Sequence, residues 1–345
     1  MVSAASPLVK APSDSEIPSD GRKNYYARHT RGLRQELSQR LDAEELRELH
    51  QVSTWRHLAV TAGQFGVMGL ATWGLIVFTH PLIWIPLAVV QGFVIFNFTV
   101  MLHEVVHDNA IRGGRSRSKA FWNKVLGFLY AIPSGISRTQ FTRWHLDHHD
   151  SLGSEEDDPK RHRLSPKVNK RWYKLLYFTP ALIFIYFRAA KEENATYPRE
   201  LQRTIRNERL ATIAVHLAAF AALAYFFGWG AAGRAYLVPY LLVFPVAFAL
   251  NRLCQHYFIV PEDPAQWSTL MKVSRFWDIA YLWSTYHLEH HYYPRVPFYN
   301  MPKLRRKLEP FFRQRGMSDH SIRELLYHYI VLNKRPHTNW SLHLD

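Results

Sequence analysis

The sequence is poor in cysteine, and long parts of it carry no charge. Its only cysteine is Cys254, which excludes an intramolecular disulfide framework and a metal site built from several cysteines. No Asp, Glu, Lys or Arg occurs from His57 to Leu102, and Arg234 is the only such residue between Leu210 and Asn251. A soluble fold spreads its charges more evenly along the chain, so two blocks of this kind indicate a membrane protein.

Each apolar block divides into two segments that can form membrane-spanning helices. The first block breaks at the Thr79–Pro81 turn into residues 58–78 and 82–102, and each segment covers ~30 Å as a helix, the thickness of the hydrocarbon core. The second block breaks at a glycine-rich turn into residues 210–227 and 235–250. The sequence therefore predicts an all-α integral membrane fold, with four transmembrane helices in two hairpins and a cytosolic helical cap.

Positive charge is concentrated outside the apolar blocks. The formal net charge is +15, and the external loops of a four-span topology would expose only Arg234 of the 43 basic residues. Because cytoplasmic segments beside membrane spans collect Lys and Arg, both termini are expected on the cytoplasmic side of a bacterial inner membrane or of the endoplasmic reticulum. This topology accounts for the charge, so we expect no nucleic-acid partner.

The same pattern divides the chain into three regions. Residues 1–50 are predicted to form a polar cytosolic arm, disordered up to about residue 28 and helical from Thr30 to His50. The arm lacks the apolar core of a secretory signal peptide, so the first span is expected to direct membrane insertion. Residues 51–310 are predicted to form the membrane domain, and residues 311–345 a cytosolic tail.

Histidine is abundant, with 19 residues in the chain. Eight of them form three clusters with helical spacing: His103 and His107 in HEVVHD, His145, His148 and His149 in HLDHH, and His287, His290 and His291 in HLEHH. Residues three or four apart share one face of a helix, so each cluster can direct its imidazoles at one point. One tetrahedral zinc ion needs four ligands, so eight clustered imidazoles indicate two metal ions. In the four-span topology all three clusters lie on the cytoplasmic face.

The order and spacing of these motifs resemble the membrane fatty acid desaturase family. The resemblance covers roughly residues 55–310 and rests on HEVVHD, on HLDHH and, beyond the second hairpin, on HLEHHYYPRVP. It implies that the eight clustered histidines bind two non-haem iron ions, which use O2 and electrons from outside to oxidise a lipid chain in an apolar tunnel. Members of the family usually add a ligand after the second hairpin, for which His256 is the candidate and Asn251 the alternative.

Carboxylates beside the clusters are candidates for orienting the histidines. An acidic group that accepts the second imidazole N–H fixes the tautomer and the direction of the ring. The five candidates are Glu104, Asp108, Asp147, Asp150 and Glu289. The acidic stretch from Glu155 to Asp158 is instead expected to be a solvated loop. No HPGG haem-binding signature of a fused cytochrome b5 occurs, so the electron donor is expected to be a separate ferredoxin, cytochrome b5 or reductase.

Two other classes of function fit parts of the sequence. HEVVH also matches the HExxH motif of zinc proteases, but an intramembrane protease would leave both HxxHH clusters without a role. A metal transporter would carry its ionisable residues inside the spans, where almost none occur. Among oxygenases, desaturation of a fatty acyl chain or related lipid is the favoured interpretation, and hydroxylation or carotenoid ketolation on the same histidines is the alternative.

Overall fold

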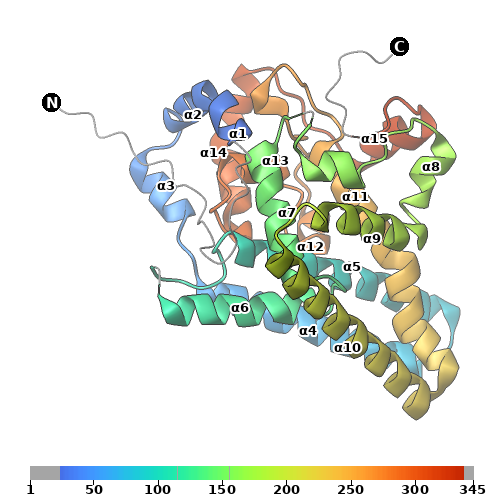
Figure 1. Cartoon of the computed structure of the whole chain (residues 1–345). Coiled ribbons are helices and arrows are strands. Elements are labelled where there is room, and N and C mark those ends of the chain that lie inside the picture. The colour runs from blue at the N-terminus through green and yellow to red at the C-terminus, as the bar shows by residue number, and fades with distance from the viewer. Residues whose placement is uncertain (1–23, 115, 155, 338–345) are drawn as a thin grey trace.

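Helices are the regular elements of the part of the chain that the structure describes. The computed structural model describes residues 24–114, 116–154 and 156–337, where the only strand-like feature is an isolated bridge between Met271 and His320 (Figure 1). The elements are α1 Tyr25–His29, α2 Arg31–Ser38, α3 Ala43–Leu49, α4 Thr54–Val77, α5 Pro81–Val106, α6 Arg117–Ala131, α7 Arg138–Ser151, η1 Lys160–Leu164, α8 Arg171–Leu176, α9 Ala181–Asn194, α10 Arg199–Ala232, η2 Gly233–Val243, α11 Phe244–His256, η3 Pro264–Gln266, α12 Arg275–Ala280, α13 His287–Tyr292, η4 Phe298–Asn300, α14 Met301–Gln314, α15 Ile322–Leu326 and η5 Tyr327–Val331. The predicted all-α class is confirmed for these residues.

Three helical stretches are long and apolar enough to cross a membrane. Among the described residues they are Ala43–Val77, Pro81–Val106 and Arg199–His256. The most apolar window of Pro81–Val106 is 67% buried in the protein, whereas that of Arg199–His256 is 6% buried. The middle stretch, α5, is therefore the central helix, and the third presents most of its apolar side chains outward, as a lipid-facing helix does.

The long third stretch contains a break. Gly228 has φ 81° and ψ 162°, a conformation that no residue of a right-handed helix adopts and that glycine reaches without steric cost. Beyond the break, η2 packs against α10. Figure 1 shows the chain descending along α10, turning at its lower end and returning towards α11. The two apolar segments predicted at 210–227 and 235–250 therefore lie side by side within this one stretch.

Close packing around α5 determines where its last turn lies. A Cβ atom added to Gly92 would stand 2.4 Å from the Val243 Cβ, so η2 approaches the backbone of α5 directly. Small residues allow this approach between membrane helices. The polar end of α5 projects beyond these contacts towards α7 and α13, which lie above the long helices in Figure 1. This packing positions the first histidine cluster against the other two.

The N-terminal arm begins its helical structure earlier than the sequence predicted. Residues 1–23, part of the segment expected to be disordered, lie outside the described residues, but Tyr25–His29 forms helix α1. Tyr25 and Tyr26 pack against buried Trp267, and the Tyr26 hydroxyl donates to the His291 carbonyl at 3.3 Å. The expectation of disorder up to about residue 28 is therefore wrong for residues 25–28, because two aromatic side chains gain buried contacts there.

Candidate metal centre

Four segments bring the histidines together. The last turn of α5 and the residue after it carry His103 and His107, whereas α7 and α13 carry the two HxxHH clusters. The end of α11 adds His256. Ser137 is the N-cap of helix α7, and its hydroxyl accepts from the Gln140 backbone N–H at 3.1 Å, which favours a helix that begins at the next residue.

The nine histidines form two separate groups. The ligand atoms within each group all lie within 4.8 Å of one another. We call them the five-histidine group, which contains His103, His107, His145, His149 and His290, and the four-histidine group, which contains His148, His256, His287 and His291. Both groups draw on α7 and α13, so neighbouring residues of one motif serve different groups.

The distances between ring nitrogens suit a shared metal ion. In the five-histidine group the Nε2 atoms of His107 and His145 are 2.7 Å apart, and those of His103 and His290 are 3.0 Å apart. In the four-histidine group the Nε2 atoms of His287 and His256 are 3.1 Å apart. Nitrogens at right angles about an ion, each bonded at ~2.1 Å, would be roughly 3 Å apart. The Nε2 atom of His148 is buried without a hydrogen-bond partner, as expected of a nitrogen that faces a metal site.

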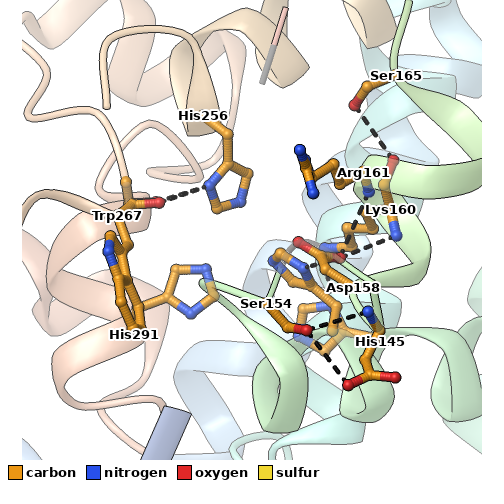
Figure 2. Close-up of polar contacts among 12 residues, drawn as sticks. His145, Ser154, Asp158, Lys160, Arg161, Ser165, His256, Trp267 and His291 are labelled. Carbon is orange, nitrogen blue, oxygen red and sulfur yellow. Dashed lines mark hydrogen bonds and ion pairs between the residues drawn. The ribbon is translucent and has the colours of Figure 1, made fainter. Parts of the chain in front are cut away.

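Two of these rings are oriented by acceptors that sequence reasoning missed. The Nδ1 atom of His148 lies 2.9 Å from a carboxylate oxygen of Asp158, and the Nδ1 atom of His256 lies 3.0 Å from the Trp267 carbonyl oxygen. Figure 2 shows the second contact, with His291 beside it. Both acceptors favour a hydrogen on Nδ1, which leaves the Nε2 lone pair free for a metal.

Burial keeps these imidazoles neutral. It lowers the pKa of His145 and His148 well below the ordinary value of 6.5, and nearby Lys160 lowers it further. The same direction, with burial as the main cause, holds for His107, His149, His287, His290 and His291. Since neutral imidazole is the form that binds metal, protons compete little with an ion at neutral pH.

An apolar cavity of about 360 Å³ lies against the histidines. His103, His145, His287 and His290 contribute to its wall, and aromatic side chains such as Trp283 form much of the remainder. Trp283 has φ 58°, a backbone conformation that is costly for a non-glycine residue and that occurs most often at functional sites. The volume lies within the range of small-molecule pockets, ~300–1,000 Å³. The cavity therefore offers an apolar ligand direct access to both groups.

Comparison with known proteins identifies the family. The fatty acid desaturase family model matches residues 79–323, well over half of the chain. The chain belongs to the fatty acid desaturase family. As a member of that family, it is an oxidoreductase that acts on lipids.

Curated proteins that this chain resembles carry sphingolipid names. It is 25% identical over 256 residues to a Homo sapiens sphingolipid delta(4)-desaturase/C4-monooxygenase, a match that covers 69% of each chain. It is 27% identical over 252 residues to a Drosophila melanogaster sphingolipid delta(4)-desaturase, with 69% of this chain and 70% of the relative covered. A Gallus gallus sphingolipid delta(4)-desaturase is 35% identical over 63 residues, which is 18% of each chain.

The two glutamates predicted beside the clusters differ in what they contact. Glu104 lies beside a histidine, with a carboxylate oxygen 3.4 Å from the His103 Nδ1. Glu289 instead pairs with buried Arg305 at 3.1 Å. Glu104 is therefore in position to orient a ring, whereas Glu289 is engaged by an arginine.

The three aspartates predicted beside the clusters have other neighbours. Both oxygens of Asp108 are used away from the rings, by Asn123 at 2.7 Å and by Lys119 at 2.8 Å. Asp147 bonds Arg143 at 2.9 Å, and Asp150 is half-buried near the end of α7. For Asp108 the predicted orienting role is therefore replaced by a contact with a lysine.

The expectation that the acidic stretch up to Asp158 forms a solvated loop is wrong for its last residue. Asp158 is 2% exposed and reaches His148. The carboxylate is buried because the turn before η1 folds it back onto α7, and a short turn of this kind has no periodic pattern that sequence reasoning can detect. The only available signal was an acidic residue ten positions after His148.

Asn251, the alternative to His256 as a ligand, lies five residues earlier on α11. Its side-chain amide donates to the Ser284 hydroxyl at 2.7 Å, and its carbonyl oxygen accepts from Gln255 at 2.8 Å. Both ends of the amide thus have protein partners, whereas the His256 Nε2 faces the other rings of the four-histidine group. This geometry favours His256.

Proposed function

We propose that this protein is a membrane-bound di-iron desaturase that removes two hydrogens from a lipid chain at the expense of O2. The observation that carries the proposal is the pair of histidine groups beside one apolar cavity in a member of the desaturase family. The five-histidine group and the four-histidine group would each hold one iron. When bound, the iron pair would supply the O2 activation that an unactivated carbon chain requires.

The overall reaction balances with two electrons from outside. A –CH2–CH2– unit loses two hydrogens and becomes –CH=CH–, while O2 takes up these hydrogens, two electrons and two protons and leaves as two molecules of water. The donor of the two electrons would be a separate ferredoxin, cytochrome b5 or reductase. Burial of each methylene in the cavity would contribute about 0.8 kcal/mol to binding, so an alkyl chain can be held without polar contacts.

For the membrane arrangement we propose four spans, with both termini on the cytoplasmic side. The break at Gly228 and the packing of η2 on α10 support a second hairpin beside the one formed by α4 and α5. The nine histidines and the basic residues would then share the cytoplasmic face of a bacterial inner membrane or of the endoplasmic reticulum.

Hydroxylation is the second candidate, and the name of one relative supports it. The Homo sapiens relative bears both a desaturase and a monooxygenase name. In hydroxylation one oxygen atom of O2 would enter the chain and the other would leave as water. Ketolation of a carotenoid would use the same site.

Lipid mass spectrometry of cells that express the chain tests the proposal. Loss of two mass units from a lipid indicates desaturation, and a gain of sixteen indicates hydroxylation. Elemental analysis of the purified protein should find about two iron ions per chain. One zinc and no iron, with unchanged lipids, would instead support the zinc protease and overturn the proposal.

A further inference from the structure

The cavity has a second polar region, separate in space from the histidine groups. It consists of His216 on α10 and a tyrosine pair, Tyr236 and Tyr240, on η2. The two tyrosine rings are tilted by 30° with their centroids 4.6 Å apart, and the centroid of the His216 ring is 5.2 Å from that of Tyr240. Tyr240 precedes Gln255, the last cavity residue on α11, by fifteen positions, on the order of 20 Å along a helix.

This polar region lies in an apolar part of the protein, which indicates that it has a function. His216 lies in the apolar stretch that is long enough to span a membrane, where a polar side chain is costly and usually serves binding or transport. The cavity also reaches the outer apolar surface there. Two of its lining residues on the same helix, Ile213 and Leu217, are 46% and 64% exposed. A lipid could therefore enter from the bilayer beside the tyrosine pair.

Hydrogen bonding determines which chemistry the tyrosine pair presents to a ligand. The His216 Nε2 lies 2.7 Å from the Ile132 carbonyl oxygen, which can only accept, so this nitrogen carries the ring hydrogen. The Nδ1 of the neutral ring is then an acceptor, and the Tyr236 hydroxyl, its partner, must donate to it.

The Tyr240 hydroxyl also uses its hydrogen within the protein. Its hydroxyl donates to the Pro133 carbonyl oxygen at 2.9 Å. A third cavity residue, Ser134, donates to the Tyr130 carbonyl at 2.8 Å. Each hydroxyl has used its only hydrogen, so the oxygens retain lone pairs alone. These three hydroxyls therefore accept hydrogen bonds from a ligand but have no hydrogen left to donate to one.

From this arrangement we infer that the tyrosine pair is a specificity site, which selects a neutral lipid carrying hydroxyl or amide N–H donors. The inference rests on the proposed function, because it assigns the substrate class of the same cavity. A carboxylate or phosphate brings further acceptors and would meet no donor at these oxygens, so an anionic lipid would be disfavoured. A plain alkyl chain would leave the remaining lone pairs of the phenol oxygens without a donor.

Binding to the purified full-length protein in lipid nanodiscs tests the inference without O2 or an electron donor. The probes are a saturated N-acyl amino alcohol, its N-methyl, O-methyl counterpart with the same chains, and a saturated free fatty acid. Each competes with a fluorescent lipid for the cavity. The wild type should prefer the N-acyl amino alcohol over its methylated counterpart by about three- to tenfold for each hydrogen bond.

Substitutions in the tyrosine pair test whether this preference arises at these two hydroxyls. Tyr236→Phe and Tyr240→Phe should each bring the affinities for the two matched probes together, with little change for the methylated one. Tyr225→Phe, at a position 84% exposed on α10, should retain the wild-type preference. Equal affinities in the wild type, a preference for the free fatty acid, or a preference that survives both cavity variants would overturn the inference.

The wild-type comparison of the matched probes decides the question even if a variant fails to fold. Iron content and lipid turnover are measured on the same preparations. A protein with iron and turnover but no preference would overturn only the specificity site, whereas a protein with the preference but without iron would overturn the proposed desaturase.

Discussion

The two histidine groups have different surroundings. All members of the four-histidine group are buried, and two of its rings have an oxygen acceptor at Nδ1, supplied by Asp158 and the Trp267 backbone. In the five-histidine group His103 and His149 are only partly buried. Three members of the five-histidine group line the cavity, whereas His287 is the one member of the four-histidine group that does.

The charges beside the groups differ as well. The Asp158 carboxylate stands against the four-histidine group. The five-histidine group instead has two charged neighbours of opposite sign, with the Glu104 carboxylate 3.4 Å from the His103 Nδ1 and the Lys160 amine 3.2 Å from the His145 Nδ1. Burial lowers the pKa of Lys160 to about 7. The four-histidine group therefore has the features of a site that retains its ion through oriented ligands, and the five-histidine group those of a site that faces the substrate.

Removing one ligand from each group should give the largest effect. His148→Ala leaves the four-histidine group with three rings and leaves buried Asp158 without its imidazole partner. We expect bound iron to fall from about two ions per chain to about one, and turnover to fall at least about 100-fold. His149→Ala leaves four rings in the other group and should retain more iron. Elemental analysis and lipid mass spectrometry measure both quantities.

A histidine outside both groups serves as the control. His80 is exposed between α4 and α5, so His80→Ala should leave iron and turnover unchanged. Membrane insertion should be the same in all three variants. If His148→Ala kept two irons and full turnover, His148 would not be a ligand and the division into two groups would be wrong.

A smaller effect is expected from the carboxylate that orients His148. Asp158→Asn removes the charge but preserves the shape, and loss of such a partner typically weakens metal binding about 10- to 100-fold. The weakening should fall on the four-histidine group, so a chelator titration should release one ion earlier than in the wild type and the other at the wild-type concentration.

The neighbouring aspartate provides the matched control for this change. Asp157 is exposed and accepts from Ser154 at 3.2 Å, so Asp157→Asn should leave both ions in place. Equal and early release of both ions from Asp158→Asn would show that the two groups are not independent, and the contrast between them would then lose its basis.

Sequence reasoning identified which histidines come together but not how they divide. The i, i+3, i+4 spacing directs all three rings of a cluster to one side of its helix, and the nine predicted residues do converge. Yet His148 and His149 differ by about 100° around α7 and face different groups. Which ring meets which partner depends on how α7 lies against α11 and α13, a tertiary relation that spacing does not contain.

For the helices, too, sequence predicted the long regular elements but not the short turns between them. Long apolar runs predicted segments at 58–78 and 82–102, close to the observed α4 and α5, because a helix in lipid must satisfy all its backbone groups internally. Asp158 lies instead in a short turn, where no repeating pattern indicates burial. The candidate ligands could thus be predicted from the sequence, whereas the residues placed to orient them became visible only in the fold.

The smallest effect in this series concerns the alternative ligand on α11. Asn251→Ala removes two neutral hydrogen bonds, to Ser284 and from Gln255, and should lower the free energy of unfolding by about 1–3 kcal/mol while leaving two irons bound. His256→Ala removes a ring of the four-histidine group and should reduce iron to about one ion per chain. Both residues lie on α11, five positions apart, and both are 2% exposed, so the pair is matched in burial. If Asn251→Ala reduced bound iron to about one ion per chain and His256→Ala did not, Asn251 would be the ligand and the buried His256 a packing residue.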